Sequence, residues 1–216
     1  MIRLGIHTAG SFCGASILKD GVVASSIARE MKRGHDQFLP DVCAEAANEA
    51  GVSLSGLGGI SVCVGPGSFT GLRIGVAFAR GLALSNDLVA DGVTSLEALL
   101  GKPPESPTLV LLPAKRRLPD ISFWAQIIRP DSVGEAFELE AKYLPDHLDE
   151  VSDILTDSDG AGLLESVAPD LKPIIKNASP ESVALWSQYS GAFPSRAPSP
   201  VYVREPDAIP AKSLIR

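Results

Sequence analysis

Residues 65–73 read Gly-Pro-Gly-Ser-Phe-Thr-Gly-Leu-Arg and lead into an apolar run that reaches Ser85. Three glycines and a proline predict a tight loop that feeds the N-terminus of a helix. The free backbone N–H groups and the dipole at such a terminus can hold an anion. The loop is therefore a candidate anion or nucleotide site, whose residues would be Gly65, Pro66, Gly67, Ser68, Phe69, Thr70 and Arg73.

The loop matches no common nucleotide motif. It lacks the Gly-Lys-Ser/Thr ending of a Walker A loop and the spacing of Gly-x-Gly-x-x-Gly. Arg73 is the one nearby cation, and it could serve a phosphate, a carboxylate or the loop's own backbone. Ser68 and Thr70 have no His or acid close in sequence, which disfavours a serine nucleophile.

The helix after the loop is apolar on nearly all sides. Small residues recur every four positions, bulky residues form a second stripe, and the polar face holds only Arg73 and Arg80. A helix of this kind must be buried. Its cover is either this chain's own core or a partner protein. The small stripe is Gly71, Gly75, Ala79 and Ala83, and the bulky stripe is Ile74, Phe78 and Leu82.

Three histidines could serve metal or acid–base chemistry. His35 precedes a predicted helix, but position 39 is Leu, so the pair that a helical metal site needs is missing. His7 ends the first predicted strand, where a nucleotide-binding loop would normally carry an acid for its metal ion. His147 lies in an acidic segment and is expected to be solvated. We predict no metal site and no catalytic residue.

The remaining chemical candidates favour ordinary structural roles. The basic cluster at residues 115–117 reads as a solvated loop, and residues 157–162 as a plain turn rather than a calcium loop. Cys13, Cys43 and Cys63 fit no zinc or redox spacing, so we expect buried, reduced thiols.

Composition and charge limit the classes of partner that this protein can bind. The 216 residues carry a formal net charge of −7, and residues 131–170 hold twelve acids against one base, Lys142. That segment should repel a nucleic-acid backbone. The N-terminus resembles no signal peptide, and no apolar run is long enough to cross a bilayer, so we expect a cytoplasmic protein without membrane contact.

The order of predicted elements indicates an α/β fold in two parts. Three β-strands open the chain as a meander, followed by a helix at 39–50, a buried strand at 59–64, the glycine-loop helix, a strand at 88–93 and a helix at 95–100. Residues 102–107 read as a linker. We expect subdomains at 1–101 and 108–216, the second smaller in regular structure, with a helix starting at Ser179 and ending before Gly191.

Four segments together resemble a known family. They are residues 6–9, the Gly-His-Asp-Gln-Phe-Leu-Pro run at 34–40, the glycine loop, and Pro-Val-Tyr-Val-Arg at 200–204. The chain resembles the TsaB (YeaZ) family of bacterial tRNA threonylcarbamoyladenosine biosynthesis proteins. The match covers residues 1–100 and returns near Tyr202. The resemblance implies an actin-like ATPase fold, of the sugar kinase/Hsp70 kind, with two mixed-sheet subdomains, the second reduced.

The resemblance also implies a function. Such proteins are non-catalytic partners of the TsaD subunit in placing a threonylcarbamoyl group on adenosine 37 of tRNAs that read codons starting with A. A TsaE-like ATPase would be a further partner, tRNA would be reached through the complex, and ATP or ADP could sit at a complex interface. Alone, the chain could form a homodimer. The expected interface residues are Leu39, Val42, Cys43, Ala46, Gly71, Leu72, Gly75, Phe78, Ala79 and Leu82.

Two departures from the family pattern stand out. His7 replaces a customary Asp, and Pro-Ala-Lys-Arg-Arg at 113–117 replaces an Asp-Ala-Arg-Arg-like stretch. TsaD-like proteins hold a metal through a His-x-x-x-His pair, which here is His35 and Leu39. The alternatives from the same superfamily are a metal-dependent glycoprotease-like peptidase and an ATP-dependent kinase. The missing His and the missing Asp argue against each.

Overall fold

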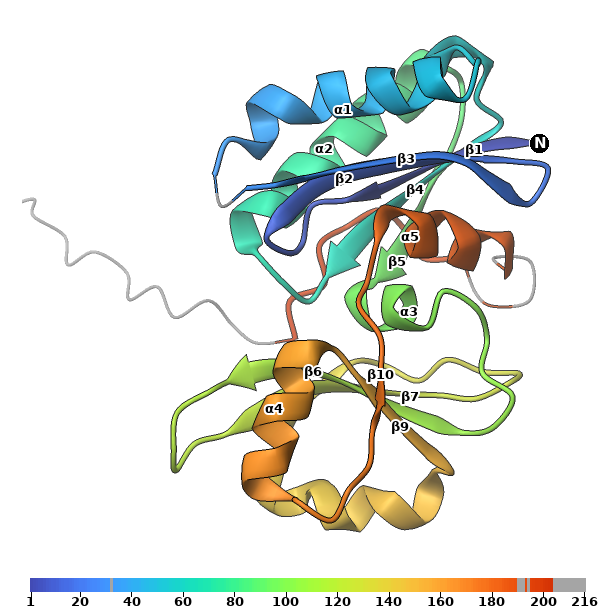
Figure 1. Ribbon diagram of the computed structural model, residues 1–216. Helices are drawn as coiled ribbons and strands as arrows, with labels where there is room; N and C mark the ends of the chain where they lie inside the picture. The colour runs from blue at the N-terminus through green and yellow to red at the C-terminus, as the bar shows by residue number, and fades with distance from the viewer. Residues whose placement is uncertain (32, 190–192, 194, 204–216) are drawn as a thin grey trace, which may run out of the picture.

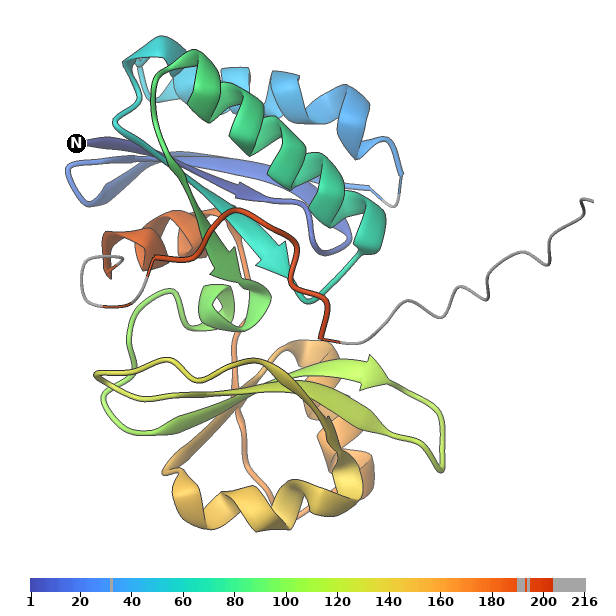
Figure 2. The same ribbon diagram turned by 180° about the vertical axis from the view of Figure 1, so that it is seen from behind.

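The computed structural model describes residues 1–31, 33–189, 193 and 195–203, and it has two lobes stacked one above the other (Figure 1). Each lobe is built on a five-stranded sheet. Helices α1 and α2 cover the outer face of the upper sheet, while α3 and α5 lie between the two sheets (Figures 1 and 2). None of the described helices is long and apolar enough to cross a membrane.

The upper lobe begins with an antiparallel meander and continues with parallel strands. Its strand order is β3-β2-β1-β4-β5, with β4 and β5 parallel to β1. Alternation along β1 places Leu4 and Ile6 under the two outer helices and Gly5 and His7 on the opposite face. The elements are β1 Ile2–His7, β2 Phe12–Lys19, β3 Val22–Glu30, α1 His35–Glu49, η1 Leu54–Gly56, β4 Gly59–Gly65, α2 Phe69–Ser85 and β5 Ala90–Thr94.

The lower lobe repeats the same topology. Its strand order is β8-β7-β6-β9-β10, again with two antiparallel pairings followed by two parallel ones. The sequence shows no repeat, because the common feature is the order of strand pairing and not the residues. The elements are β6 Thr108–Lys115, β7 Ser122–Ile128, β8 Phe137–Glu140, η2 Ala141–Glu150, β9 Asp153–Thr156, α4 Ser158–Val167 and β10 Ile174–Ile175.

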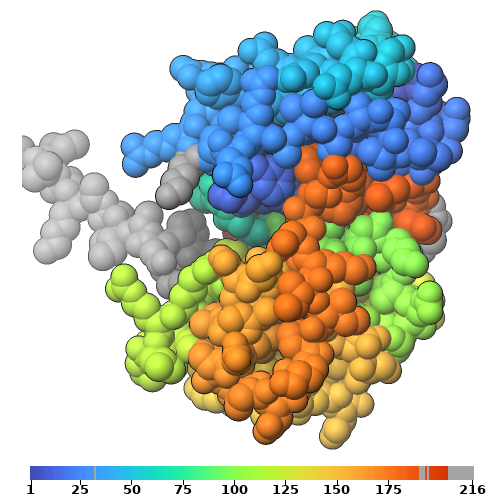
Figure 3. Space-filling view, in the orientation of Figure 1, coloured from blue at the N-terminus to red at the C-terminus, as the bar shows by residue number. Residues whose placement is uncertain are grey.

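Helix α5 Pro180–Trp186, followed by η3 Ser187–Tyr189, returns to the upper lobe. It packs on β1 and β2, where Gly5 and Gly14 leave room for it; a Cβ on Gly5 would lie 2.7 Å from the backbone N of Ala184. In the space-filling view this segment fills the seam between the lobes (Figure 3). Helix α5, which falls within the predicted second subdomain at 108–216, thus packs on the sheet of the first.

Local signals explain most helix ends. α3 Ser95–Leu100 starts with a capping box between Thr94 and Glu97 and ends at Gly101, which has φ +71°. Ser179 caps α5 as predicted. α1 begins at His35, four residues earlier than the sequence indicated, with Pro40 inside its second turn.

One element prediction was wrong. Residues 157–162 do not form a plain turn, because Asp157 caps α4 by accepting a hydrogen bond from the Gly160 N–H at 2.6 Å. The two glycines in this stretch lower helix propensity and hide the helix from a reading of the sequence.

Candidate functional site

The glycine loop joins β4 to α2 and is tied to its neighbours by hydrogen bonds. Gly65 has φ +99°, a conformation that glycine adopts without strain. The Ser95 hydroxyl donates to the Pro66 carbonyl at 2.7 Å, and the Ser68 N–H donates to the Ala9 carbonyl at 2.8 Å. Ser68 also caps α2 by accepting from the Gly71 N–H at 3.3 Å. Two donors that an anion would use are thus occupied within the chain.

The stripe of small residues on α2 faces this chain's own sheet. A Cβ on Gly71 would lie 2.0 Å from the Thr8 carbonyl oxygen, and one on Gly75 would lie 2.3 Å from Thr8 Oγ1. The Thr8 hydroxyl donates to the Gly71 carbonyl at 2.8 Å, which fixes the contact. The close backbone approach that the stripe predicts is therefore made with Thr8, the residue that directly follows β1.

Eight of the ten predicted interface residues are buried inside the monomer, mostly in the core between the outer helices and the upper sheet, so in this structure the chain itself covers them. Phe78 and Leu82 are half-buried and pack against the same core. The eight buried residues are Leu39, Val42, Cys43, Ala46, Gly71, Leu72, Gly75 and Ala79.

A different stripe of α2 faces outward. Arg73, Ala77, Arg80 and Leu84 follow one another at helical spacing, and all four are exposed, Leu84 at 84 %. We call these four residues the outer stripe. α2 lies across the outer surface of the upper lobe (Figure 2), and it contains no acidic residue. The sequence also contains this outer stripe, because the same helical periodicity that groups the small residues on one face groups these four on the opposite face.

The first turn of α2 also meets the end of the described chain. The Arg73 guanidinium carbon lies 3.8 Å from the centre of the Phe69 ring, and Arg73 Nε donates to the Tyr202 hydroxyl at 3.1 Å. The rings of Phe69 and Tyr202 are 5.4 Å apart. The glycine loop and the segment around residue 202, far apart in sequence, are thus brought together. Arg204 lies outside the described residues.

The lobes enclose a cleft of about 600 Å³. The upper lobe contributes the end of β1, the β1–β2 connection and the glycine loop. The lower lobe contributes the end of β6, Trp124 on β7 and the start of α4. The sequence identified His7 and the glycine loop as candidates. The sequence did not predict that Trp124, Arg116 and Asp157 line this cleft, because the cleft forms only when the two lobes face each other in the fold.

His7 lies on the face of β1 that looks toward the lower lobe and lines this cleft. Its side chain is 3 % exposed, and neither ring nitrogen has a hydrogen-bond partner. Its ring stacks on Phe12 at 4.7 Å between centroids. Burial lowers the pKa of His7 from 6.5 to about 4, since the charged imidazolium loses its hydration.

This pKa shift predicts a specific acid sensitivity. The folded pKa is below the unfolded one, so His7 favours the folded state above pH 6.5 and loses this contribution as the pH falls toward 4. Between pH 7.5 and pH 5 we expect His7 to remove about 2 kcal/mol from the free energy of unfolding. Urea unfolding of wild type and His7→Asn at both pH values measures it. Equal pH dependence of the two proteins would contradict the assignment.

Helix α1 contains a single histidine. His35 opens α1, and Leu39, one turn later, is fully buried in the core. In the described ranges, no three His, Cys, Asp or Glu side chains cluster so as to hold a metal ion. The three thiols are free and buried, and burial raises the pKa of Cys13 and of Cys63 to about 11. None of them is poised as a nucleophile.

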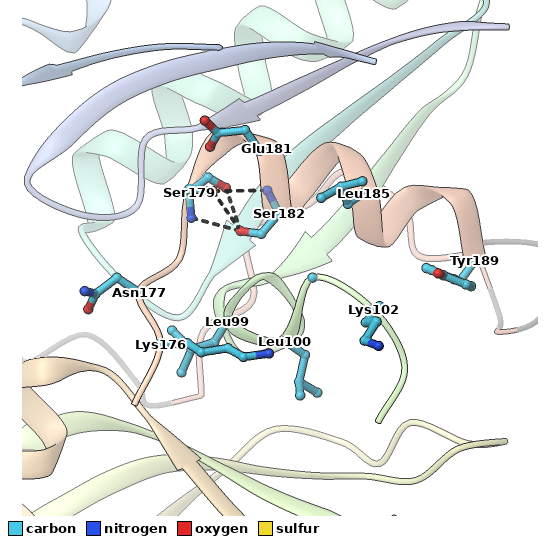
Figure 4. Close-up of a pocket in the computed structure, with 11 residues that line it drawn as sticks. Leu99, Leu100, Lys102, Lys176, Asn177, Ser179, Glu181, Ser182, Leu185 and Tyr189 are labelled. Atoms are coloured by element: carbon cyan, nitrogen blue, oxygen red, sulfur yellow. Dashed lines mark hydrogen bonds between the residues drawn. The ribbon is translucent and has the colours of Figure 1, made fainter. Parts of the chain in front are cut away.

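A second cavity of about 480 Å³ lies beside α3 and α5 (Figure 4). Leu99, Leu100 and Leu185 give it an apolar wall, with Lys102 and Lys176 as the cations. The hydroxyls of Ser179 and Ser182 bond each other and the neighbouring backbone in the cap of α5. Its two serine hydroxyls are thus already paired, which makes it a weaker candidate than the cleft that His7 lines.

Comparisons with known proteins agree with this architecture. Residues 21–118 match the family model described as TsaD: tRNA N6-adenosine threonylcarbamoyltransferase. The crystal structure titled YeaZ from Pseudomonas aeruginosa superimposes with a TM-score of 0.70 at 21 % identity, covering 93 % of this chain and 99 % of that one. The expected actin-like fold with two mixed-sheet subdomains is confirmed.

Two curated relatives extend the comparison. The tRNA threonylcarbamoyladenosine biosynthesis protein TsaB of Escherichia coli is 30 % identical over 146 residues, which are 66 % of this chain and 62 % of the relative. The tRNA N6-adenosine threonylcarbamoyltransferase of Syntrophus aciditrophicus is 31 % identical over 174 residues, 67 % of this chain and 51 % of the relative. The chain thus spans between half and two thirds of the length of these relatives. With the glycine loop, its helix and the fold in agreement, the chain belongs to the TsaB (YeaZ) family.

Proposed function

We propose that this protein is a non-catalytic subunit of the machinery that places a threonylcarbamoyl group on adenosine 37 of tRNAs reading codons that start with A. It acts by pairing with a TsaD-like transferase subunit. The observation that carries the proposal is family membership combined with a helix α1 that has His35 but Leu39 in place of a second metal ligand. A buried leucine cannot hold a metal, so the chemistry belongs to the partner.

The outer stripe of α2 is the proposed contact with the TsaD-like subunit. Ala77 is small enough to let another helix approach closely, while Arg73 and Arg80 give the stripe a positive charge on a protein of net charge −7. An acidic partner surface is the matching chemistry. Phe69 and Tyr202 add aromatic area of the kind enriched at binding hot spots. The same stripe would serve a homodimer when the partner is absent.

The remaining partners follow from charge and from the family. Residues 131–170 are strongly acidic, so tRNA is reached through the complex and not through this chain's lower lobe. A TsaE-like ATPase is the further partner. The complex works in the cytoplasm, where free, buried thiols such as these are the rule.

Depleting the protein and digesting the tRNA to nucleosides tests the proposal. We expect the threonylcarbamoyladenosine peak to fall at least tenfold in mass spectrometry and to return when the wild-type chain is supplied again. An unchanged peak contradicts the role in tRNA modification. One equivalent of zinc or iron in the purified chain, or turnover of ATP by the chain alone, would contradict the non-catalytic assignment and favour the peptidase or kinase alternative.

A further inference from the structure

After η3 the chain returns across the upper lobe as an irregular segment, residues 195–203, which we call the strap. It is the red segment that crosses β5 in Figure 2. Two backbone hydrogen bonds attach it to the sheet. The Gly92 N–H on β5 donates to the Arg196 carbonyl at 2.7 Å, and the Val201 N–H donates to the Val64 carbonyl on β4 at 2.8 Å. The strap is thus fixed to the upper sheet near both of its ends.

A buried ion pair anchors the start of the strap. Arg196 Nη1 donates to both carboxylate oxygens of Glu97, at 2.8 and 2.7 Å. Glu97 is 2 % exposed, and its carboxylate also accepts from the Thr94 N–H in the cap of α3 at 2.7 Å. Removing one partner of a buried pair leaves the other charge without compensation, which is strongly unfavourable. The strap is therefore anchored on a group inside the protein.

The end of the strap holds the first residue of the outer stripe. The Tyr202 hydroxyl accepts from Arg73 Nε at 3.1 Å, while the Arg73 guanidinium carbon lies 3.8 Å from the centre of the Phe69 ring. An exposed arginine normally loses much rotamer freedom when it binds a partner. Tyr202 and Phe69 impose part of this order before binding, and such preorganisation raises affinity.

Arg73 keeps most of its donors for another group. Among the described residues, the only hydrogen bond of its guanidinium is the one from Nε to Tyr202. Both Nη groups remain free, and N–H groups of a guanidinium can bind the two oxygens of a carboxylate in a bidentate manner. The matching group on a partner is therefore an aspartate or glutamate side chain.

We propose that the strap positions Arg73 for a carboxylate of the TsaD-like subunit, with the Arg196–Glu97 pair as its anchor and Tyr202 as its contact. The proposal rests on the proposed pairing through the outer stripe of α2. Arg196 and Glu97 are positioning residues, since they act through Tyr202. The strap thereby connects a buried carboxylate on α3 to the surface that meets the partner.

Hydrogen exchange at Arg73 Nε tests the positioning in the free chain, without any partner. In ¹⁵N spectra the Arg73 Nε–H should exchange about threefold faster or more in Tyr202→Phe, which keeps the ring and removes the acceptor. Arg196→Gln, which breaks the anchor, should give the same increase and should also speed exchange of the Gly92 amide. Unchanged exchange of the Leu4 amide on β1 shows that each variant is folded.

Arg196→Lys is the conservative variant. A single nitrogen of Arg196 makes both contacts with Glu97, so an ammonium group can replace it. We expect the Arg73 Nε–H of this variant to exchange at the wild-type rate. Ser199→Ala, an exposed change on the strap away from its anchors, is the control and should also leave this rate unchanged.

A double-mutant cycle tests the consequence for pairing. Tyr202→Phe should weaken binding of the TsaD-like subunit about threefold or more in titration calorimetry, and it should have no further effect once Arg73 is replaced by alanine. In an Arg80→Ala background, Tyr202→Phe should keep its full effect, because Arg80 lies two turns further along α2.

The two measurements separate this inference from the proposed function. The inference is overturned if Arg73 Nε exchanges at the wild-type rate in both Tyr202→Phe and Arg196→Gln. It is also overturned if Tyr202→Phe pairs like the wild type, or weakens pairing equally with and without Arg73. If the wild-type chain does not bind the TsaD-like subunit at all, the proposed function fails, and this inference falls with it whatever the exchange rates are.

Discussion

Gly71→Ala is expected to lower the free energy of unfolding by about 3 kcal/mol or more, a large share of the roughly 5–15 kcal/mol by which folded domains are stable. The added methyl group would lie 2.0 Å from the Thr8 carbonyl oxygen, which belongs to the backbone and cannot rotate away. To relieve the clash, α2 would have to move away from Thr8 and break the Thr8–Gly71 hydrogen bond. Urea unfolding followed by circular dichroism measures the loss.

Gly81→Ala is the matched control on the same helix. Gly81 is exposed, and a Cβ there would meet nothing within 4 Å. Alanine is the better helix former, so this change should stabilise the protein by up to about 1 kcal/mol. If Gly71→Ala is as stable as wild type, the small stripe does not pack against Thr8, and that face would be available to a partner after all.

The contrast between Gly71 and Gly81 shows which properties of α2 can be predicted from the sequence and which cannot. Periodicity correctly groups Gly71, Gly75 and Ala79 on one face and predicts close backbone contact there. It does not say which backbone makes the contact. Gly71 and Gly75 are covered by Thr8, which directly follows β1 and lies sixty-three residues before Gly71, and no local pattern connects the two segments. For this reason the sequence left open whether this chain's own core or a partner covers the stripe.

Several signals confined to a few neighbouring residues were read correctly. The capping residue Ser179 and the start of α3 at Ser95 were placed from local patterns, and the burial of the three cysteines was foreseen from their apolar surroundings. The cleft was not predicted as such, since Arg116, Trp124 and Asp157 meet His7 only through the repeated topology of the two lobes. Strand β10, with two exposed isoleucines, has no pattern long enough to read.

Ala77→Asp is expected to weaken pairing with the TsaD-like subunit of the same organism by roughly a hundredfold. Ala77 is exposed at the middle of the outer stripe, so the monomer should fold normally with aspartate there. In the complex the carboxylate would be buried against the partner's acidic surface, which complements Arg73 and Arg80. An unpaired buried charge costs several kcal/mol. Titration calorimetry of the two purified subunits measures the affinity, with far-ultraviolet circular dichroism as the check on folding.

The choice of Ala77 follows from what the structure says of its neighbours. Phe78 is half-buried against the core and Gly75 touches Thr8, so changes at either would disturb folding and pairing together. Ser166→Asp is the control, because it adds the same charge to an exposed helical position on α4 of the other lobe. It should leave the affinity unchanged.

Leu84→Asp, at the end of the outer stripe, should weaken pairing as well. Wild-type affinity of both stripe variants would exclude α2 as the contact and direct attention to other exposed surfaces of the upper lobe.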